Sequence, residues 1–470
     1  MSADPTSTEN PFLSGLMAPV LDERDDVGLE VEGELPGELR GLFVRNGPNP
    51  RFAPKDAYHP FDGDGMVHAL YLADGEVRYR NRWIESKGLL AERKRGRACF
   101  GSLSKFSMPP EDVIEEAGFM KNTANTHFVR HDGHYFALME AGRPTELSRD
   151  LETLGEYDFG GALPGAMTAH PKIDPVTGDL VFFGYSPVPP FLQYYVVDRS
   201  GRMVHHEVID IPNPVMMHDF VATENYTVFL DSPAIFDVEA MMQDGPAMRW
   251  EPEKGTRLGV IPRFGRADEV RWFEVDPCYV VHFFNAWDEG DRIEIHAPSF
   301  ASMPGGLQFD DPSQTEEPYP RRFQIDLSAG SVKSEQTDDR PGEFPRVNDE
   351  RACRRHRYQY DTTARSWEFE FDFDGVVKYD LETGGSTVFA HGRNEVCGEH
   401  VFVPRPGARA EDDGWLMTHV SDRETMRSKV VLLDARDLEA GPVAQIHMPR
   451  RVPIGFHANW LPDGPDGAPG

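Results

Sequence analysis

Short runs of apolar and β-branched residues, separated by glycine-containing turns, recur along most of this chain. Turn signals such as Asp74-Gly75, Asp132-Gly133 and Thr383-Gly384 fall between them. An Asp-Gly pair between two such runs is typical of a tight β-hairpin. The sequence therefore predicts an all-β fold with many antiparallel strands. The runs are Gly41–Arg45, Met66–Tyr71, Tyr135–Met139, Leu180–Tyr185, Tyr194–Asp198, Tyr226–Leu230, Arg292–His296, Val376–Asp380, Gly414–Thr418 and Lys429–Asp434.

The repetition of hairpins over several hundred residues favours a β-propeller, in which four-stranded blades surround a central axis. The innermost strands of a propeller meet at that axis, so residues far apart in sequence can share one site. We expect an N-terminal arm over residues 1–22 and a single propeller domain over residues 23–470. One helix is predicted over Pro110–Gly118, in a loop between strands.

Four of the 17 histidines lie in or beside apolar, strand-like runs. His170 precedes a proline and an Asp-Pro-Val-Thr-Gly turn, and the other three are His218, His282 and His457. Each of them, taken alone, is more simply explained as a buried, hydrogen-bonded histidine. Four matched settings instead indicate a metal site, and four imidazoles without a carboxylate suit iron, copper or zinc.

Histidine ligands need hydrogen-bond acceptors behind them, because these fix the ring tautomer and offset the charge of the ion. Three glutamates in strand-like settings are candidates for this role: Glu140, Glu343 and Glu399. For each of them alone, a place at the surface is the simpler expectation.

The charge of the chain bears on its partners. Asp plus Glu number 79 against 48 Lys plus Arg, a formal net charge of −31. Such a surface disfavours nucleic acid and anionic membranes. The four scattered cysteines contain no C-x-x-C pair, which argues against a thiolate zinc site and fits a reducing cytoplasm. No apolar run is long enough for a spanning helix, and the N-terminus lacks the features of a signal peptide.

Seven segments together resemble the carotenoid cleavage oxygenase family. The resemblance extends from about Gly33 to Pro462, almost the whole chain, and the segments occur in the family's order. Any one of them would be a weak signal, whereas the ordered set is specific. They are Phe43–Pro50, Phe61–Met66, Asn122–Thr126, Thr168–Pro171, Met217–Phe220, Phe402–Arg405 and Arg451–His457.

The resemblance implies a seven-bladed β-propeller, with loops and short helices forming a dome over an axial, catalytic Fe(II). It implies that His170, His218, His282 and His457 are the iron ligands. It further implies that Glu140, Glu343 and Glu399 support three of these histidines, and that Thr126 lies near a vacant position on the iron. The reaction it implies uses O2 to cleave a conjugated carbon–carbon double bond into carbonyl products.

Two positions bear on the substrate. A branch of the family that cleaves stilbenes or isoeugenol holds the substrate's phenol with a tyrosine and a lysine. The matching positions here are Leu103 and Met139, which are both apolar. Burying a phenol without a partner is unfavourable, so we expect an apolar polyene, a carotenoid or apocarotenoid, as the substrate.

Other readings stay open at this point. The chain fits a stilbene- or phenylpropenoid-cleaving oxygenase of the same family, a metal-dependent isomerase or hydrolase, or a non-catalytic propeller that serves as a binding module. The segment between Phe106 and Met120 is short and acidic, so any membrane contact is expected to be weak and peripheral. We expect a monomer.

Overall fold

The computed structural model describes residues 6, 10–243, 245–304, 316–367 and 372–463. Strands dominate these residues, with three α-helices and seven short 3-10 helices among them. The chain divides into two compact units. Unit 1 comprises Met1–Gly160, Met241–Gly245 and His391–Gly470, and unit 2 comprises Gly161–Ala240 and Pro246–Ala390. The expected division into an N-terminal arm and one domain stays a prediction.

Unit 1 contains three antiparallel sheets. The first has the order β1-β5-β4-β3-β33, the second β6-β7-β8-β9, and the third β2-β32-β31-β30-β28, with β29 also paired to β30. The strands are β1 (Arg24–Val27), β2 (Val31–Gly33), β3 (Gly41–Arg45), β4 (Met66–Ala73), β5 (Glu76–Trp83), β6 (His127–His131), β7 (His134–Leu138), β8 (Thr145–Leu147), β9 (Thr153–Glu156), β28 (Glu395–Cys397), β29 (Val401–Pro404), β30 (Gly414–Asp422), β31 (Ser428–Asp434), β32 (Pro442–His447) and β33 (Ala458–Pro462).

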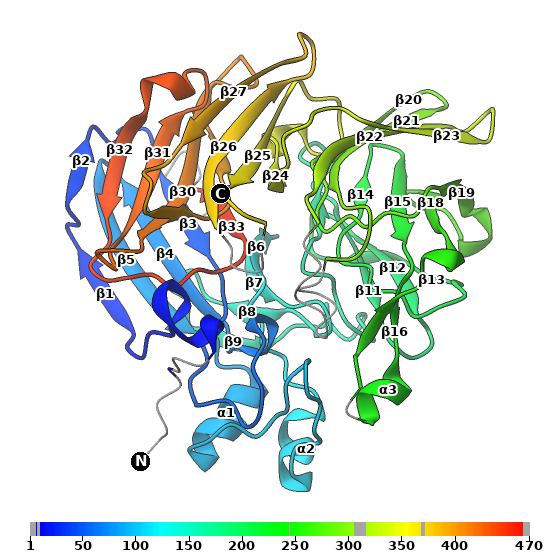
Figure 1. Ribbon diagram of the computed structural model, residues 1–470, viewed down its shortest axis with the longest axis horizontal. Helices are drawn as coiled ribbons and strands as arrows, with labels where there is room; N and C mark the ends of the chain where they lie inside the picture. The colour runs from blue at the N-terminus through cyan, green and yellow to red at the C-terminus, as the bar shows by residue number, and fades with distance from the viewer. Residues whose placement is uncertain (1–5, 7–9, 244, 305–315, 368–371, 464–470) are drawn as a thin grey trace. The chain divides into compact units, whose positions relative to one another are not determined.

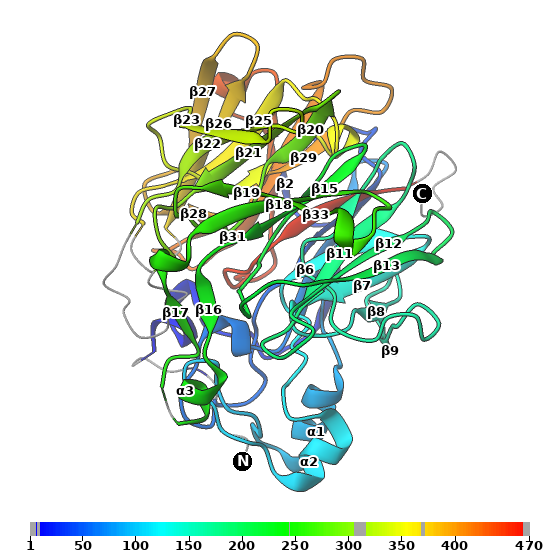
Figure 2. The same ribbon diagram turned by 90° about the vertical axis from the view of Figure 1, so that its right-hand side faces the viewer.

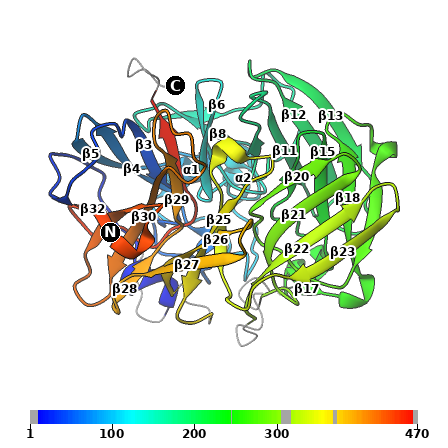
Figure 3. The ribbon, with the colours of Figure 1, turned by 90° about the horizontal axis from the view of Figure 1, so that it is seen from above.

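Unit 2 contains four four-stranded antiparallel sheets and a separate two-stranded hairpin. Figure 3 shows one of them, β20 to β23, with its strands side by side in chain order. The strands of the four sheets are β10 (Lys172–Ile173), β11 (Leu180–Tyr185), β12 (Leu192–Val197), β13 (Met203–Ile209); β14 (Val221–Ala222), β15 (Tyr226–Asp231), β18 (Thr256–Pro262), β19 (Arg271–Val275); β20 (Asn285–Glu289), β21 (Arg292–Ser299), β22 (Tyr319–Asp326), β23 (Ser331–Gln336); β24 (Glu343–Arg346), β25 (Tyr358–Ala364), β26 (Phe373–Asp380) and β27 (Gly385–Ala390).

The three sheets of unit 1 and the four larger sheets of unit 2 are the blades of a seven-bladed β-propeller, as predicted. Every predicted strand run coincides with an observed strand to within a few residues. The hairpin turns follow from their sequence: Asp74 and Gly75 both have positive φ (54° and 76°), as do Asp132 and Gly133 (47° and 78°). Two positive values in succession match the twist of the flanking strands, and Asp-Gly accepts them readily.

The first sheet of unit 1 joins the two ends of the chain. β33, near the C-terminus, pairs with β3, near the N-terminus, and Phe43 lies opposite Trp460. Both side chains belong to an apolar cluster that also contains Trp415. In the same unit, the backbone nitrogen of Val20 donates to Asn49 Oδ1, and Asn49 Nδ2 donates to the carbonyl of Val20.

The helices are short and lie between strands. In unit 1, α1 (Lys87–Arg95) and α2 (Glu111–Ala117) lie side by side (Figure 1). β16 (Ala234–Phe236) and β17 (Met248–Trp250) form the two-stranded hairpin of unit 2, and α3 (Val238–Met242) lies between them in sequence (Figure 2). The 3-10 helices are Pro11–Leu13, Gly15–Met17, Pro60–Asp62, Pro252–Lys254, Ala267–Glu269, Asp349–Arg351 and Leu438–Ala440.

The helix predicted over Pro110–Gly118 is α2, whereas α1 was not predicted. Ser86 caps the start of α1, because its Oγ accepts a hydrogen bond from the Leu89 backbone nitrogen, and Gly96 ends the helix in the left-handed conformation (φ 67°). No helix in the described ranges has the length and apolarity needed to cross a bilayer.

Candidate metal centre

His170 stands at the entrance to β10, where the chain is fixed by Asp174. The backbone nitrogens of Val176 and Thr177 donate to Asp174 Oδ1, which makes the turn rigid. Arg354 and Arg263 donate to the two Asp174 carboxylate oxygens at 2.7 Å and 2.6 Å. Burial acts to raise the pKa of Asp174, but the hydrogen bonds from Arg354, the backbone and Arg263 outweigh it and lower the pKa to about 2. Asp174 is therefore ionised at neutral pH and holds the segment that carries His170.

His218 lies in the loop before β14, next to a buried carboxylate with three donors. Asp219 Oδ1 accepts from Lys172 Nζ at 2.7 Å and from the Phe220 backbone nitrogen at 2.8 Å. Asp219 Oδ2 accepts from the Phe283 backbone nitrogen at 2.9 Å. Lys172 is two residues after His170, and Phe283 follows His282. One carboxylate thus ties together the three segments of unit 2 that carry candidate ligands, a role that the sequence did not reveal.

His282 is oriented by Glu343, at the start of β24. His282 Nδ1 lies 2.6 Å from Glu343 Oε2, and both side chains are buried. The backbone nitrogen of Phe344 also donates to this glutamate oxygen. A carboxylate accepts and does not donate, so Nδ1 carries the proton and Nε2 presents its lone pair on the opposite side of the ring.

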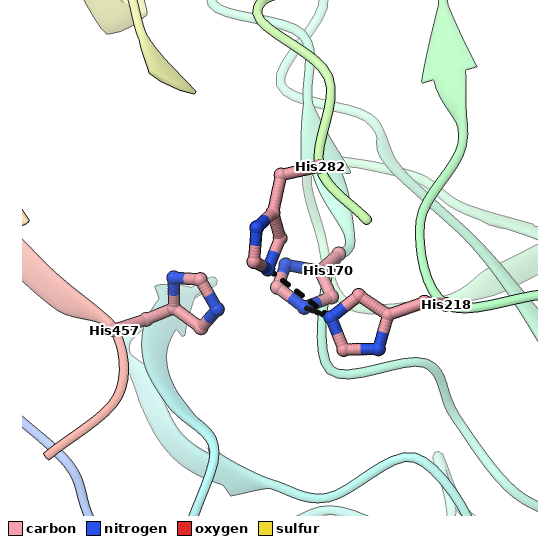
Figure 4. Close-up of side chains that lie close together, drawn as sticks. All are labelled: His170, His218, His282 and His457. Carbon is pink, nitrogen blue, oxygen red and sulfur yellow. Dashed lines mark hydrogen bonds between the residues drawn. The ribbon is translucent and has the colours of Figure 1, made fainter. Parts of the chain in front are cut away.

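Three imidazole Nε2 atoms of unit 2 converge. His170 Nε2 and His218 Nε2 are 3.0 Å apart, and His218 Nε2 and His282 Nε2 are 3.1 Å apart. The close-up in Figure 4 draws these contacts as dashed lines. Each of the three residues is less than a tenth exposed. Nitrogens that meet in this way, away from water, form a set of donors for a metal ion.

His457, also drawn in Figure 4, belongs to unit 1, directly before β33. His457 Nδ1 lies 3.3 Å from Glu399 Oε1, and the backbone nitrogen of Ala458 donates to Glu399 Oε2 at 2.7 Å. The arrangement parallels that of His282 and Glu343. Thr126 lies against the same residue, since its carbonyl oxygen accepts from the His457 backbone nitrogen at 3.2 Å.

Glu140 lies two residues beyond the end of β7 in unit 1 and is half-buried. The role expected for it behind a histidine stays a prediction.

Leu103 and Met139 line one cleft of unit 1, although 36 positions separate them in sequence. Its apolar wall includes Phe61, Phe100 and Phe119, but Tyr58, Asp62 and Lys121 also line it. The cleft has a volume of about 90 Å³, which is small beside the roughly 300–1,000 Å³ of a typical small-molecule site. The cleft is therefore too small to enclose a whole polyene.

Comparison with known proteins shows the family to which the chain belongs. The sequence profile described as "Retinal pigment epithelial membrane protein" matches residues 17–462. A carotenoid 9,10(9',10')-cleavage dioxygenase of Phaseolus vulgaris is 35% identical over 97% of this chain and 90% of its own length. The chain belongs to the carotenoid cleavage oxygenase family. The function and enzyme class predicted from the sequence are thereby confirmed at family level: this is an oxidoreductase of a dioxygenase family.

Other relatives of this oxygenase cover both branches of the family. An isoeugenol monooxygenase of Pseudomonas nitroreducens is 33% identical over 96% of the chain and 98% of its own length. The solved structure of a Pseudomonas brassicacearum lignostilbene dioxygenase has a TM-score of 0.90 and 32% identity, covering 97% of this chain and 99% of that one. A cobalt-substituted Synechocystis oxygenase has a TM-score of 0.84 and 29% identity, covering 94% and 97%.

Proposed function

We propose that His170, His218, His282 and His457 hold one Fe2+ ion and that this oxygenase uses O2 to cleave a conjugated carbon–carbon double bond. The observation that carries the proposal is the convergence of three buried Nε2 atoms at 3.0 Å and 3.1 Å. The side chains of His170, His218, His282 and His457 are all buried, and as a group they could hold a metal ion.

The spacing of the nitrogens supports iron over zinc. Two nitrogens about 2.1 Å from one ion lie about 3.0 Å apart at a right angle and about 3.4 Å apart at the tetrahedral angle. The spacings of 3.0 Å and 3.1 Å in unit 2 fit the right angle, which leaves positions open on the ion. Zinc sites are usually tetrahedral, whereas ferrous oxygenases keep open positions. The bound iron would supply the activation of O2.

The protein's own residues orient the ligands. Four neutral imidazoles leave the charge of the ion uncompensated, and we propose that Glu140, Glu343 and Glu399 offset it through the histidines without touching the ion. Glu343 and Glu399 fix the Nδ1–H tautomer of His282 and His457, so that Nε2 is the donor atom. Asp219 holds together the three segments of unit 2 that carry His170, His218 and His282. Thr126, beside His457, is proposed to restrict access to an open position.

For the substrate we propose a carotenoid or apocarotenoid, bound with one end near Leu103 and Met139. Neither side chain can hydrogen-bond a phenol, whereas the aromatic wall of the cleft suits a polyene. A phenolic stilbene or isoeugenol is the second candidate, favoured by Tyr58 and Lys121 in the same cleft and by the two relatives that act on such compounds in name.

Delivery of an apolar substrate is proposed to occur through weak peripheral contact with a membrane. Met108, Phe119 and Met120 flank α2 and are 48%, 55% and 38% exposed, and the last two line the cleft. The acidic residues of α2 keep this contact weak. A cytoplasmic location is proposed, since the four buried cysteines form no disulfide, and a monomer is proposed as well.

The test is anaerobic reconstitution with Fe2+, followed by a mass-resolved screen of carotenoids, apocarotenoids, stilbenes and isoeugenol under O2. Cleavage gives two shorter carbonyl products that contain oxygen from O2. An isomerase would give a product of unchanged mass, and a binding module would bind no stoichiometric iron. Either result would overturn the proposal.

A further inference from the structure

A second group of metal-binding side chains lies in unit 1 and uses none of the four histidines. It consists of His391, Cys397 and His400, whose ligand atoms all lie within 4.8 Å of one another. His391 Nε2 and His400 Nε2 are 3.2 Å apart. The three residues are 9%, 2% and 1% exposed, and Cys397 forms no disulfide. Two imidazoles and a thiol thus meet at one protected point.

The local fold explains why these side chains meet. The chain reverses direction after His391, where the Glu395 backbone nitrogen donates to the Gly392 carbonyl and the Gly392 nitrogen donates to the Glu395 carboxylate. β28 then pairs with β30, so that Cys397 lies opposite Val420. The turn brings His391 back against the segment that carries Cys397 and His400. The three residues lie within ten consecutive positions of the sequence, and this turn brings their side chains together.

We infer that His391, Cys397 and His400 form a binding site for a soft divalent cation, Zn2+ in particular. Thiolate and imidazole together select zinc among the abundant divalent ions, because calcium and magnesium prefer oxygen ligands. The separation of 3.2 Å between the Nε2 atoms lets both nitrogens bind one ion, since two nitrogens about 2.1 Å from an ion lie about 3.0–3.4 Å apart. Three protein ligands leave the fourth position for water or another small ligand. Binding releases the thiol proton of Cys397 to solvent.

The position of the site gives the ion a consequence for the neighbouring glutamate. His400 follows Glu399, which contacts the ring of His457 and the backbone of Ala458. An ion fixed to His400 and Cys397 would restrain the backbone on both sides of Glu399. The second ion would then act as a structural clamp on a residue that orients His457.

A plain hydrogen bond between His391 and His400, with Cys397 as an apolar neighbour, is the competing arrangement. Cobalt distinguishes the two, since a Co2+–thiolate bond gives a charge-transfer absorption in the near ultraviolet that imidazole ligands alone do not give. Metal-free, full-length protein is titrated with CoCl2 under anaerobic conditions. We expect a thiolate-to-cobalt band that grows until both proposed metal sites are filled and is bleached by ZnCl2.

Three variants locate the band. Cys397→Ser should abolish it, whereas Cys278→Ser, at another buried free cysteine in unit 2, should retain it. His282→Ala, which alters the four-histidine set, should also retain it. Absence of the band from the wild-type protein at saturating cobalt, or its persistence in Cys397→Ser, would overturn the inference. The wild-type titration is decisive even if a variant fails to fold, and its outcome does not depend on whether the protein cleaves polyenes.

Discussion

The carboxylate of Asp219 accepts a hydrogen bond from the backbone nitrogen of Phe283 at 2.9 Å. Asp219 follows His218 and Phe283 follows His282, so this bond links the segments of two candidate ligands. Lys172, near His170, donates to the same carboxylate at 2.7 Å. The three histidines of unit 2 lie in the segments that precede β10, β14 and β20, the first strands of three different sheets. Their convergence therefore depends on this buried side chain as well as on the blades.

Asp219→Asn tests that dependence. Asparagine keeps the size but loses the charge that balances Lys172, and its NH2 group cannot accept a backbone donor. We expect affinity for Fe2+ to fall by roughly 10–100-fold, the range for residues that orient metal ligands. Iron titration followed by metal analysis measures it. Asp198→Asn is the matched control, because Asp198 also accepts backbone and arginine hydrogen bonds but in an exposed turn. Equal affinity in the two variants would contradict the role given to Asp219.

His170→Ala and His282→Ala should each remove most of the iron and the activity while leaving the protein folded. Folding rests on the packed sheets, and the histidines contribute little to the apolar core. Metal content by mass spectrometry and strand content by circular dichroism give the two readouts. Full iron occupancy in both variants would disprove the ligand assignment.

Glu343→Gln and Glu399→Gln should weaken iron binding by roughly 10–100-fold without abolishing it. Glutamine keeps the length of the side chain but offers no charge to offset the ion. The fall should be larger for Glu343, which lies 2.6 Å from its histidine, than for Glu399 at 3.3 Å. Glu140→Gln is measured alongside, and an unchanged affinity there would remove Glu140 from the set.

The double variant Leu103→Tyr and Met139→Lys should raise kcat/KM for a 4-hydroxystilbene and lower it for an apocarotenal. A site built to hydrogen-bond a hydroxyl discriminates strongly, whereas an apolar site discriminates weakly. The wild-type protein should therefore cleave stilbenes more slowly than the best polyene. A wild-type preference for the phenol would contradict the role given to Leu103 and Met139.

Asp174→Asn should destabilise the fold at neutral pH by about 3–5 kcal/mol, because it leaves Arg263 and Arg354 without the buried carboxylate. The pKa of Asp174 is lowered to about 2 in the folded protein, against about 3.9 when unfolded. Its contribution is thus fully present above the unfolded pKa and is lost as the pH falls through the folded value. The difference in Tm between wild type and variant should be constant above about pH 5 and narrow towards pH 2. A difference that grows on acidification would refute this.

Much of the fold was predictable because hairpin chemistry is local. Asp132-Gly133 dictates its turn through two positive φ values, and the runs on either side supply β6 and β7. The sequence around α1 also contains local signals, because Ser86 caps the start of the helix and Gly96 ends it. The helix is short and weakly amphipathic, so these caps alone did not predict it. The carboxylate of Asp219 carries no such signal, since its partners Lys172 and Phe283 are brought to it by folding alone.

The site was predictable in part for a different reason. The matched settings of the four histidines could be read in the sequence, and Leu103 and Met139 were paired by resemblance before both were found in one cleft. The contact between His282 and Glu343 spans 61 positions, and nothing in the spacing of two residues across several strands specifies it. Cys397 and His391 are close in sequence, but their meeting still requires the reversal of the chain at Gly392.

The pairing of β33 with β3 makes the completion of the first sheet depend on the order in which the chain is synthesised. During synthesis β3 leaves the ribosome before β33, which follows every other strand of the described residues, so one edge of β3 has no partner until β33 has also emerged. His457 precedes β33 by a single position, so a prematurely terminated chain lacks both its closing strand and its fourth proposed ligand. Such a product would expose an unpaired strand edge, a feature that promotes aggregation.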